Sequence, residues 1–324
     1  MNKFKKILVV IDPESEFEPA VLYRAAGLAR ANSASLSVIV IVQRLPVEDL
    51  PLGIRTLARF HYPNNFRDAI EKRYRYRVGQ QIAGLETDIA VDFTLKWSRR
   101  PFVTIIQHVL SHGHDLLIKE LSRVAGLGAV LLSPTDRHLM RKCPSTIWAM
   151  KPGHPAGYRR VLAAVDSFPV DESNNELNQR ILQLADSISA NVDADLHIAN
   201  AYCAGPATSI FGFNLHEYQQ DLATVHRDHL DALLKTCSIC PSATHLLYGV
   251  PGKVIPEFAE HEGIDAIVMA TISRGGIPGL LIGNTAERIL DRVTCDVVVV
   301  KPKGFITPVS LADYDSENSF GNIE

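Results

Sequence analysis

The sequence predicts two tandem α/β domains, each built on a doubly wound parallel sheet. The first observation is an internal repeat with a period of roughly 150 residues. Residues 7–12 resemble residues 161–166, and Asp115 and Pro152 are in register with Asp265 and Pro302. The second observation is that each repeat alternates short apolar runs with longer amphipathic ones. That alternation is typical of a parallel sheet covered by helices on both faces.

The elements follow in order most clearly in the second repeat. Its continuous apolar run at 159–165 predicts a buried parallel strand, because both faces of such a strand are covered. Residues 174–191 predict a helix, since Leu177, Ile181, Leu184 and Ile188 recur at helical spacing. The remaining elements alternate as strands near 194–203, 243–249, 265–270 and 296–301, and helices near 215–236, 252–262 and 283–292.

The first repeat follows the same plan, which sets the expected domain boundaries. We expect a first domain at 1–152, a linker at 153–157, a second domain at 158–304 and a polar acidic tail at 305–324. Parallel strands joined by right-handed crossovers place a ligand crevice at their carboxyl ends. Any small-molecule site should therefore lie at that edge of a sheet.

Composition narrows the classes of function. A chain of 324 residues is long enough for two cores, and its 46% hydrophobic and 21% charged residues are typical of a globular protein. The formal net charge of −3 gives no overall attraction to nucleic acid or anionic lipid. No apolar run approaches the ~18 residues of a membrane span, and no signal peptide is recognised. Five sparse cysteines do not resemble a secreted disulfide framework, so we expect a cytoplasmic protein.

One segment of the second repeat has the features of a phosphate site. Residues 270–288 run from a predicted strand into a helix whose first turn contains Gly283, Asn284 and Thr285. Free N–H groups at a helix start, beside a hydroxyl and a residue without a side chain, suit a phosphate. The alternative is that the glycine is needed only for the turn.

Several segments together resemble the tandem form of the universal stress protein family. The resemblance is carried by the strand-end Asp12 and Asp166, by 249–251 with Ile255, by 265–269 and by 283–288. It implies a fold like that of the adenine nucleotide alpha hydrolases, with strand order 3-2-1-4-5. It also implies that segments 145–150 and 296–300 join the repeats as an internal pseudo-dimer, and it leaves a further homodimer open.

The resemblance also implies a candidate ligand site. In nucleotide-binding members a loop of the form Gly-x2-Gly-x9-Gly-Ser/Thr holds the ribose and phosphates, and the strand-end aspartate contacts the adenosine. Here the loop positions become Ala270, Ser273, Gly283 and Asn284, with Thr285 adjacent, and two added Cβ atoms would narrow the pocket. No cofactor is assigned with certainty, and ATP or another adenine nucleotide is the candidate. The expected site consists of Asp166, Ala201, Met269, Ala270, Ser273, Gly283, Asn284 and Thr285.

The same loop differs more strongly in the first repeat. Glu120 aligns with Ala270 and places a carboxylate beside any phosphate, while Ser133 aligns with Gly283. Pro134 aligns with Asn284 and has no N–H to donate at the helix start. We expect the first repeat to be a degenerate copy that does not bind ATP.

Three other features of the sequence are candidate functional sites. Cys237 and Cys240 form a CxxC with His226, His229 and His245 nearby, but the pair follows a helix, so core packing is favoured over metal or redox chemistry. The basic segment 72–77, with 99–100, could bind nucleic acid but is more typical of a solvated helix face. Apolar insertions at 45–54, 60–63 and 207–213 fit packing between the repeats, a lid or a partner surface.

The absence of Gly-x-Ser-x-Gly, Walker A and HExxH motifs argues against hydrolase chemistry. The resemblance implies a non-enzymatic stress-response protein, with roles that include resistance to DNA damage, and we expect a small amphipathic or nucleotide ligand in the second repeat. One alternative is a protein that binds ATP weakly or hydrolyses it slowly. The other is a module that binds a protein or an apolar ligand through the insertions.

Overall fold

The computed structural model describes residues 4–11, 20–43, 66–85, 89–121, 132–153, 157–168, 172–203, 215–271 and 284–311. The chain folds as two compact units. The first unit consists of residues 2–120 with 309–324, and the second unit of residues 121–308 together with Met1.

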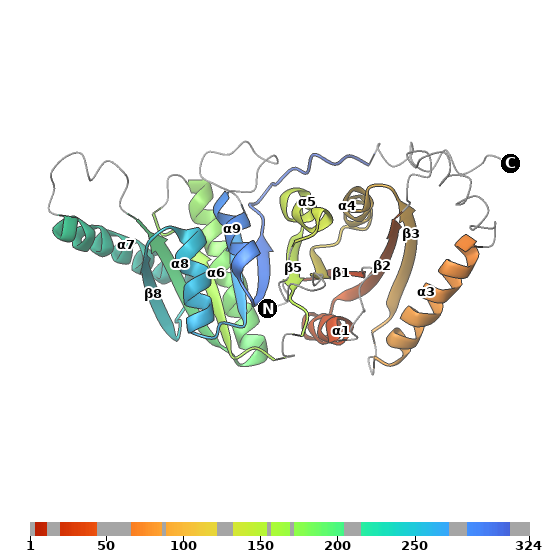
Figure 1. Ribbon diagram of the computed structural model, residues 1–324. Coiled ribbons are helices and arrows are strands. Elements are labelled where there is room, and N and C mark those ends of the chain that lie inside the picture. The colour runs from red at the N-terminus through yellow and green to blue at the C-terminus, as the bar shows by residue number, and fades with distance from the viewer. Residues whose placement is uncertain are drawn as a thin grey trace. The chain divides into compact units, whose positions relative to one another are not determined.

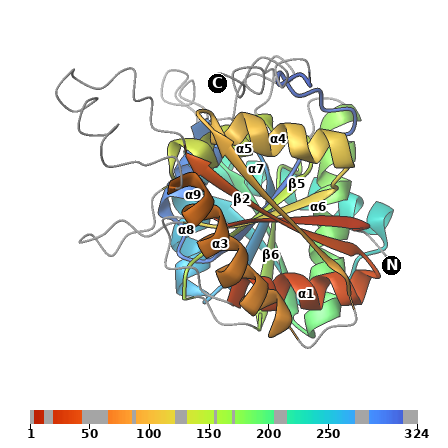
Figure 2. The ribbon, with the colours of Figure 1, turned by 90° about the vertical axis from the view of Figure 1, so that its right-hand side faces the viewer.

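The first unit contains a parallel sheet with helices on both faces (Figure 1). Its strands are β1 Lys6–Ile11, β2 Ser35–Gln43, β3 Val91–Ser98 and β4 Leu116–Glu120. Its helices are α1 Ala20–Asn32, α3 Phe66–Ala83 and α4 Pro101–His112. The parallel pairings give the order β3-β2-β1-β4, and Figure 2 shows α1 and α4 on opposite sides of these strands.

The second unit contains the complete second repeat. Its strands are β5 Thr146–Met150, β6 Arg160–Val165, β7 Asp195–Tyr202, β8 Ala243–Tyr248, β9 Ala266–Ala270 and β10 Asp296–Val300. Its helices are α5 Pro134–Lys142, α6 Glu172–Val192, α7 Leu215–Cys237, α8 Pro251–His261 and α9 Asn284–Arg292. The pairings run β8-β7-β6-β9-β10, all parallel, which confirms the order 3-2-1-4-5 for this repeat.

The last strands of the two repeats pair with each other, as predicted. β5 runs antiparallel to β10, with Trp148 opposite Val298. Helix α5 and strand β5 belong to the first repeat in sequence but to the second unit in space. The expected boundaries at 152, 157 and 304 therefore stay a prediction of the sequence.

A buried network of polar groups accompanies this strand pairing. The Asp296 carboxylate, which is fully buried, accepts hydrogen bonds from the Tyr158 hydroxyl and from the backbone N–H of Lys151. The Tyr158 hydroxyl in turn accepts from the indole N–H of Trp148 at 3.1 Å. Because buried polar groups are costly when unpaired, this network favours one register of the two strands.

The aspartates that are in register between the repeats have a structural role. Asp265 accepts hydrogen bonds from the backbone N–H groups of Arg159 and Arg160, at 2.7 and 2.9 Å. Asp115 accepts in the same way from the N–H groups of Lys5 and Lys6. In each repeat the carboxylate before the fourth strand thus binds the start of the first strand.

Candidate functional site

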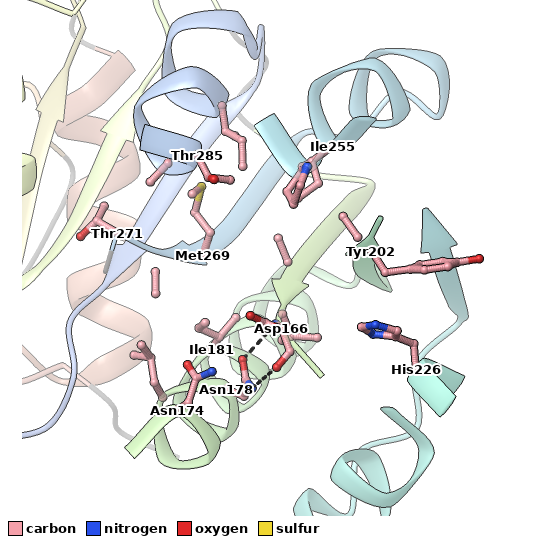
Figure 3. A pocket seen from close by; sticks show the side chains of 18 of the residues that line it. Asp166, Asn174, Asn178, Ile181, Tyr202, His226, Ile255, Met269, Thr271 and Thr285 are labelled. Carbon is pink, nitrogen blue, oxygen red and sulfur yellow. Dashed lines mark hydrogen bonds between the residues drawn. The ribbon is translucent and has the colours of Figure 1, made fainter. Parts of the chain in front are cut away.

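A cavity of about 410 Å³ lies in the second unit at the carboxyl ends of β6, β7 and β9. This is the edge at which parallel α/β sheets bind ligands. The cavity is lined by Ala164, Val165, Asp166, Asn174, Leu177, Asn178, Ile181, Ala201, Tyr202, Cys203, His226, Pro251, Ile255, Met269, Ala270, Thr271, Thr285, Ala286 and Ile289. Figure 3 draws the side chains of 18 of these residues.

Asp166 follows β6 directly, and Asn178 of α6 fixes its backbone. The Asn178 side chain accepts a hydrogen bond from the Asp166 N–H at 3.2 Å and donates to the Asp166 carbonyl at 2.6 Å (Figure 3). Asn178 is only 3% exposed, so these two bonds satisfy an amide that would otherwise be costly to bury. The pair fixes the point at which the strand ends beside the cavity.

The cavity face of α6 follows from helical spacing. Asn174, Leu177, Asn178 and Ile181 recur three and four residues apart and therefore share one side of the helix. This side mixes two amides with two aliphatic side chains, where a purely structural helix would carry an apolar stripe. The face therefore offers a ligand apolar contact from Leu177 and Ile181 beside the amide of Asn174.

Aromatic rings form another side of the cavity. The Tyr202 and His226 rings stack with centroids 5.0 Å apart and an interplanar angle of 29°. Phe168 extends the cluster, with its ring 5.6 Å from His226 and 5.1 Å from His229. Such an assembly of planar rings suits contact with a flat apolar group.

Hydroxyl groups and the start of α9 lie on the opposite side from these rings. Figure 3 shows Thr271, Met269 and Thr285 together, away from Tyr202 and His226. Thr271 follows β9 directly, and Thr285 is in the first turn of α9. That first turn has backbone N–H groups with no partner inside the helix, which favours a ligand oxygen or anion.

Two glycines shape the helices around this side of the cavity. Gly249 has φ +141°, and a Cβ there would lie 2.5 Å from Val254 Cγ1, so the turn into α8 requires glycine. At Gly252 a Cβ would come within 3.0 Å of Arg288, which shows how closely α8 approaches α9. Pro251 begins α8 where a missing N–H costs little.

The structure brings together five of the eight expected site residues. Asp166, Ala201, Met269, Ala270 and Thr285 all line the cavity. Asn284 begins α9, and its side chain is outside the described residues, as are Ser273 and Gly283. That these residues bind a ligand stays a prediction.

Sequence reasoning missed Asn174, Asn178, Tyr202, His226 and Thr271 as cavity residues. A signal for the two asparagines was present, because they interrupt the apolar stripe of α6. Tyr202 and His226 come from separate elements, and their proximity depends on how α7 packs near β7. No local pattern could have paired them.

The corresponding helix start in the first repeat is already satisfied by the chain itself. Ser133 caps α5 by accepting from the Asp136 N–H at 3.1 Å, while the Asp136 carboxylate accepts from the Ser133 N–H at 2.9 Å. Pro134 is the first helical residue. This capping box, with a carboxylate that is 1% exposed, supports the expectation that the first repeat does not hold a phosphate.

The other candidates show no reactive arrangement in the described part of the chain. Burial raises the pKa of Cys237, which disfavours the thiolate, and no group of three or more metal-ligating side chains occurs among the described residues. His245 instead contacts His197, with ring nitrogens 3.1 Å apart.

The basic segment lies within α3, and four of its side chains are exposed: Lys72, Arg73, Arg75 and Tyr76. The three apolar insertions lie outside the described residues.

Two features of the fold and cavity define a class of protein. Both repeats have the strand pairing of a doubly wound nucleotide-binding-like fold, and one repeat has a cavity at its strand ends. The described helices all fall short of the length and hydrophobicity that crossing a membrane requires. The fold is thus a tandem pair of doubly wound α/β domains in one chain, with a cavity at the strand ends of the second.

Comparison with known proteins identifies the family. The sequence pattern of the Universal stress protein family matches residues 3–151 and 157–301, so the chain belongs to this family as a tandem-domain member. It is 32% identical to universal stress protein E of Salmonella typhi over 97% of this chain and 100% of that protein. Universal stress protein E of Escherichia coli K12 is 31% identical over 98% of this chain and 100% of its own length. The protein is therefore a stress-response protein similar to universal stress protein E.

Solved structures show the same fold at lower identity. A functionally unknown protein from Pseudomonas aeruginosa PAO1 has a TM-score of 0.70 and 24% identity, over 98% of both chains. A universal stress protein from Archaeoglobus fulgidus DSM 4304 has a TM-score of 0.60 and 18% identity, over 91% of this chain and 98% of that chain. These structures extend the fold assignment to nearly the whole chain.

Proposed function

We propose that this stress-response protein acts without catalysis, by binding a small ligand in the cavity of its second repeat. The observation that carries the proposal is the cavity itself, which is about 410 Å³ and lies at the carboxyl ends of β6, β7 and β9. Its size falls in the range of about 300–1,000 Å³ that is typical of small-molecule sites. The role in stress includes resistance to DNA damage and is exerted in the cytoplasm.

The ligand is amphipathic, and an adenine nucleotide such as ATP is the leading candidate. The rings of Tyr202 and His226 and the side chain of Ile255 suit a planar, largely apolar group. The first turn of α9, with Thr285, suits a polar or anionic group on the opposite side. Ala270, in place of the family's glycine, narrows the approach of a ligand to the backbone there.

The arrangement of charged groups favours binding over hydrolysis. Among the described lining residues, Asp166 is the one carboxylate. A phosphoryl-transfer site normally pairs a metal with carboxylates and a group that positions the nucleophile. We therefore propose that ATP, when bound, is held rather than cleaved.

Equilibrium binding of ATP and of adenosine tests the proposal. Substituting Ala201→Phe introduces a ring into the cavity and is expected to reduce binding of both ligands at least tenfold. The control is Ala232→Phe on the exposed side of α7, which should leave binding unchanged. Equal ATP affinity of the two variants would contradict the proposal. So would ATP hydrolysis, measured as release of inorganic phosphate, that is as fast as the exchange of bound ATP.

A further inference from the structure

Lys301 is a buried cation next to the cavity. It follows β10 directly and is 2% exposed. Its ammonium group donates to the Thr271 hydroxyl at 3.0 Å and to the backbone carbonyl of Met140, and it lies 5.1 Å from the centre of the Phe305 ring. Every one of these partners is uncharged, so they solvate the ammonium without neutralising it.

The charge of this ammonium is not balanced within the described residues. Burial lowers the pKa of Lys301 to about 8, and the other titratable group acting on it is the Cys143 thiol. Burial raises the pKa of Cys143 to about 11, which leaves that thiol neutral at physiological pH. Arg180 adds a second cation nearby, since its guanidinium donates to the Lys301 carbonyl at 2.6 Å. A buried positive charge in such surroundings is stabilised by an anion.

The equivalent lysine of the first repeat has different surroundings. Lys151 is in register with Lys301 and is also buried, at 5% exposure. Burial lowers its pKa too, but the carboxylates of Asp296, Asp291 and Asp136 act to raise it. Three carboxylates, two of them from the second repeat, therefore compensate for the charge of Lys151. Among the described residues no carboxylate acts on Lys301 in this way.

Thr271 connects Lys301 to the cavity. Its hydroxyl accepts a hydrogen bond from the ammonium, and Thr271 is itself a lining residue. A hydroxyl has one hydrogen and two acceptor sites. Because the Thr271 oxygen accepts from Lys301, the Thr271 hydrogen can be donated to an acceptor such as a ligand oxygen. The ammonium also donates to the Met140 carbonyl of α5, so a helix of the first repeat helps to position Lys301.

We propose that Lys301 is a positioning residue that acts through Thr271 to select an anionic group of the ligand at the Thr271 side of the cavity. The inference rests on the proposed function insofar as the ligand occupies this cavity. It also assigns a role in the second repeat to helix α5 of the first.

The test compares three probes: ATP, adenosine and inorganic pyrophosphate. Lys301→Met is expected to weaken binding of ATP by about 10- to 100-fold, the range for one lost interaction with a charged group, and to leave adenosine within about twofold. Thr271→Val should act in the same direction, and Lys301→Arg should restore part of the ATP affinity. The matched control, Lys151→Met, removes a buried lysine from the equivalent position and should leave both affinities unchanged.

The outcomes separate this inference from the proposed function. Equal loss of ATP and adenosine binding in Lys301→Met, or unchanged ATP binding, overturns the inference while the cavity remains a nucleotide site. Binding of pyrophosphate but not adenosine, abolished by Lys301→Met, supports the inference and overturns the adenine assignment. Binding of none of the three probes overturns both. If Lys301→Met does not fold, the Thr271→Val variant decides by the same comparison of ATP with adenosine.

Discussion

Removal of one hydroxyl, in the variant Tyr158→Phe, is expected to destabilise the second unit by about 3 kcal/mol. The ring stays the same, so the packing of this buried residue is retained. What is lost is the donor to the fully buried Asp296 carboxylate and the acceptor for the Trp148 indole N–H. The pairing of β5 with β10 then loses part of its polar network.

The magnitude follows from the two lost hydrogen bonds. A bond to a charged acceptor contributes about 1.5–3 kcal/mol, and leaving a buried donor unsatisfied costs about 1–3 kcal/mol. The two effects share one hydroxyl and are not additive, which gives a central value of about 3 kcal/mol. For a unit of this size the midpoint of thermal unfolding should fall by about 6–12 °C.

Tryptophan fluorescence during denaturant unfolding measures the effect in the correct unit. The chain has two tryptophans, so a Trp97→Phe background leaves Trp148 as the only reporter. The control is Tyr76→Phe, a hydroxyl removed from a side chain that is 72% exposed, which should change the unfolding free energy by less than about 0.5 kcal/mol. If Tyr158→Phe and Tyr76→Phe unfold at the same denaturant concentration, the reasoning about the buried network is wrong.

Two further predictions concern backbone conformation and pH. Gly249→Ala should destabilise the second unit by about 1–3 kcal/mol, because φ is +141° and the new Cβ would meet Val254. The control is Gly79→Ala in α3, where the new Cβ has open space and the change should be neutral or slightly stabilising. Chemical denaturation measures the free energy of unfolding of both variants. Burial is the main cause that lowers the pKa of His108 to about 3. Since an unfolded histidine titrates near about 6.5, acidification to pH 5 protonates mainly the unfolded chain. The free energy of unfolding should therefore fall by about 2 kcal/mol between pH 6.5 and pH 5. His108→Gln should reduce the change of the unfolding free energy with pH, whereas His261→Gln, at an exposed position, should not. If the unfolding free energies of both variants change with pH in the same way, the role assigned to His108 is wrong.

The fold was predictable because its signals are local. The apolar run of β6 and the helical spacing of α6 are readable in short windows, and the repeat doubled each observation. Helix α6 begins at Glu172, earlier than the apolar pattern predicted, since its first turn is polar. Element ends are set by capping and by packing, which a hydrophobic pattern does not report.

The candidate site was predictable only in part. Asp166 and Ala270 were found because they lie at strand ends, and strand ends converge at one edge of a parallel sheet. Asn178 was missed because its partner, the backbone of Asp166, is 12 residues away and on a different element. Its position in the apolar stripe of α6 marks it as unusual, but its hydrogen-bond partner becomes known only from the packing of α6 against β6.

By itself, the sequence determined the architecture of this protein: two α/β repeats, their strand order through resemblance, and the edge at which a ligand should bind. Only the tertiary structure decided which side chains meet there. Thr271 and Lys301 are 30 residues apart, and Met140 and Lys301 are 161 apart, yet one ammonium group contacts both. The physical reason is that hydrophobic periodicity is a property of neighbouring residues, whereas hydrogen bonds and charge balance depend on which elements pack together.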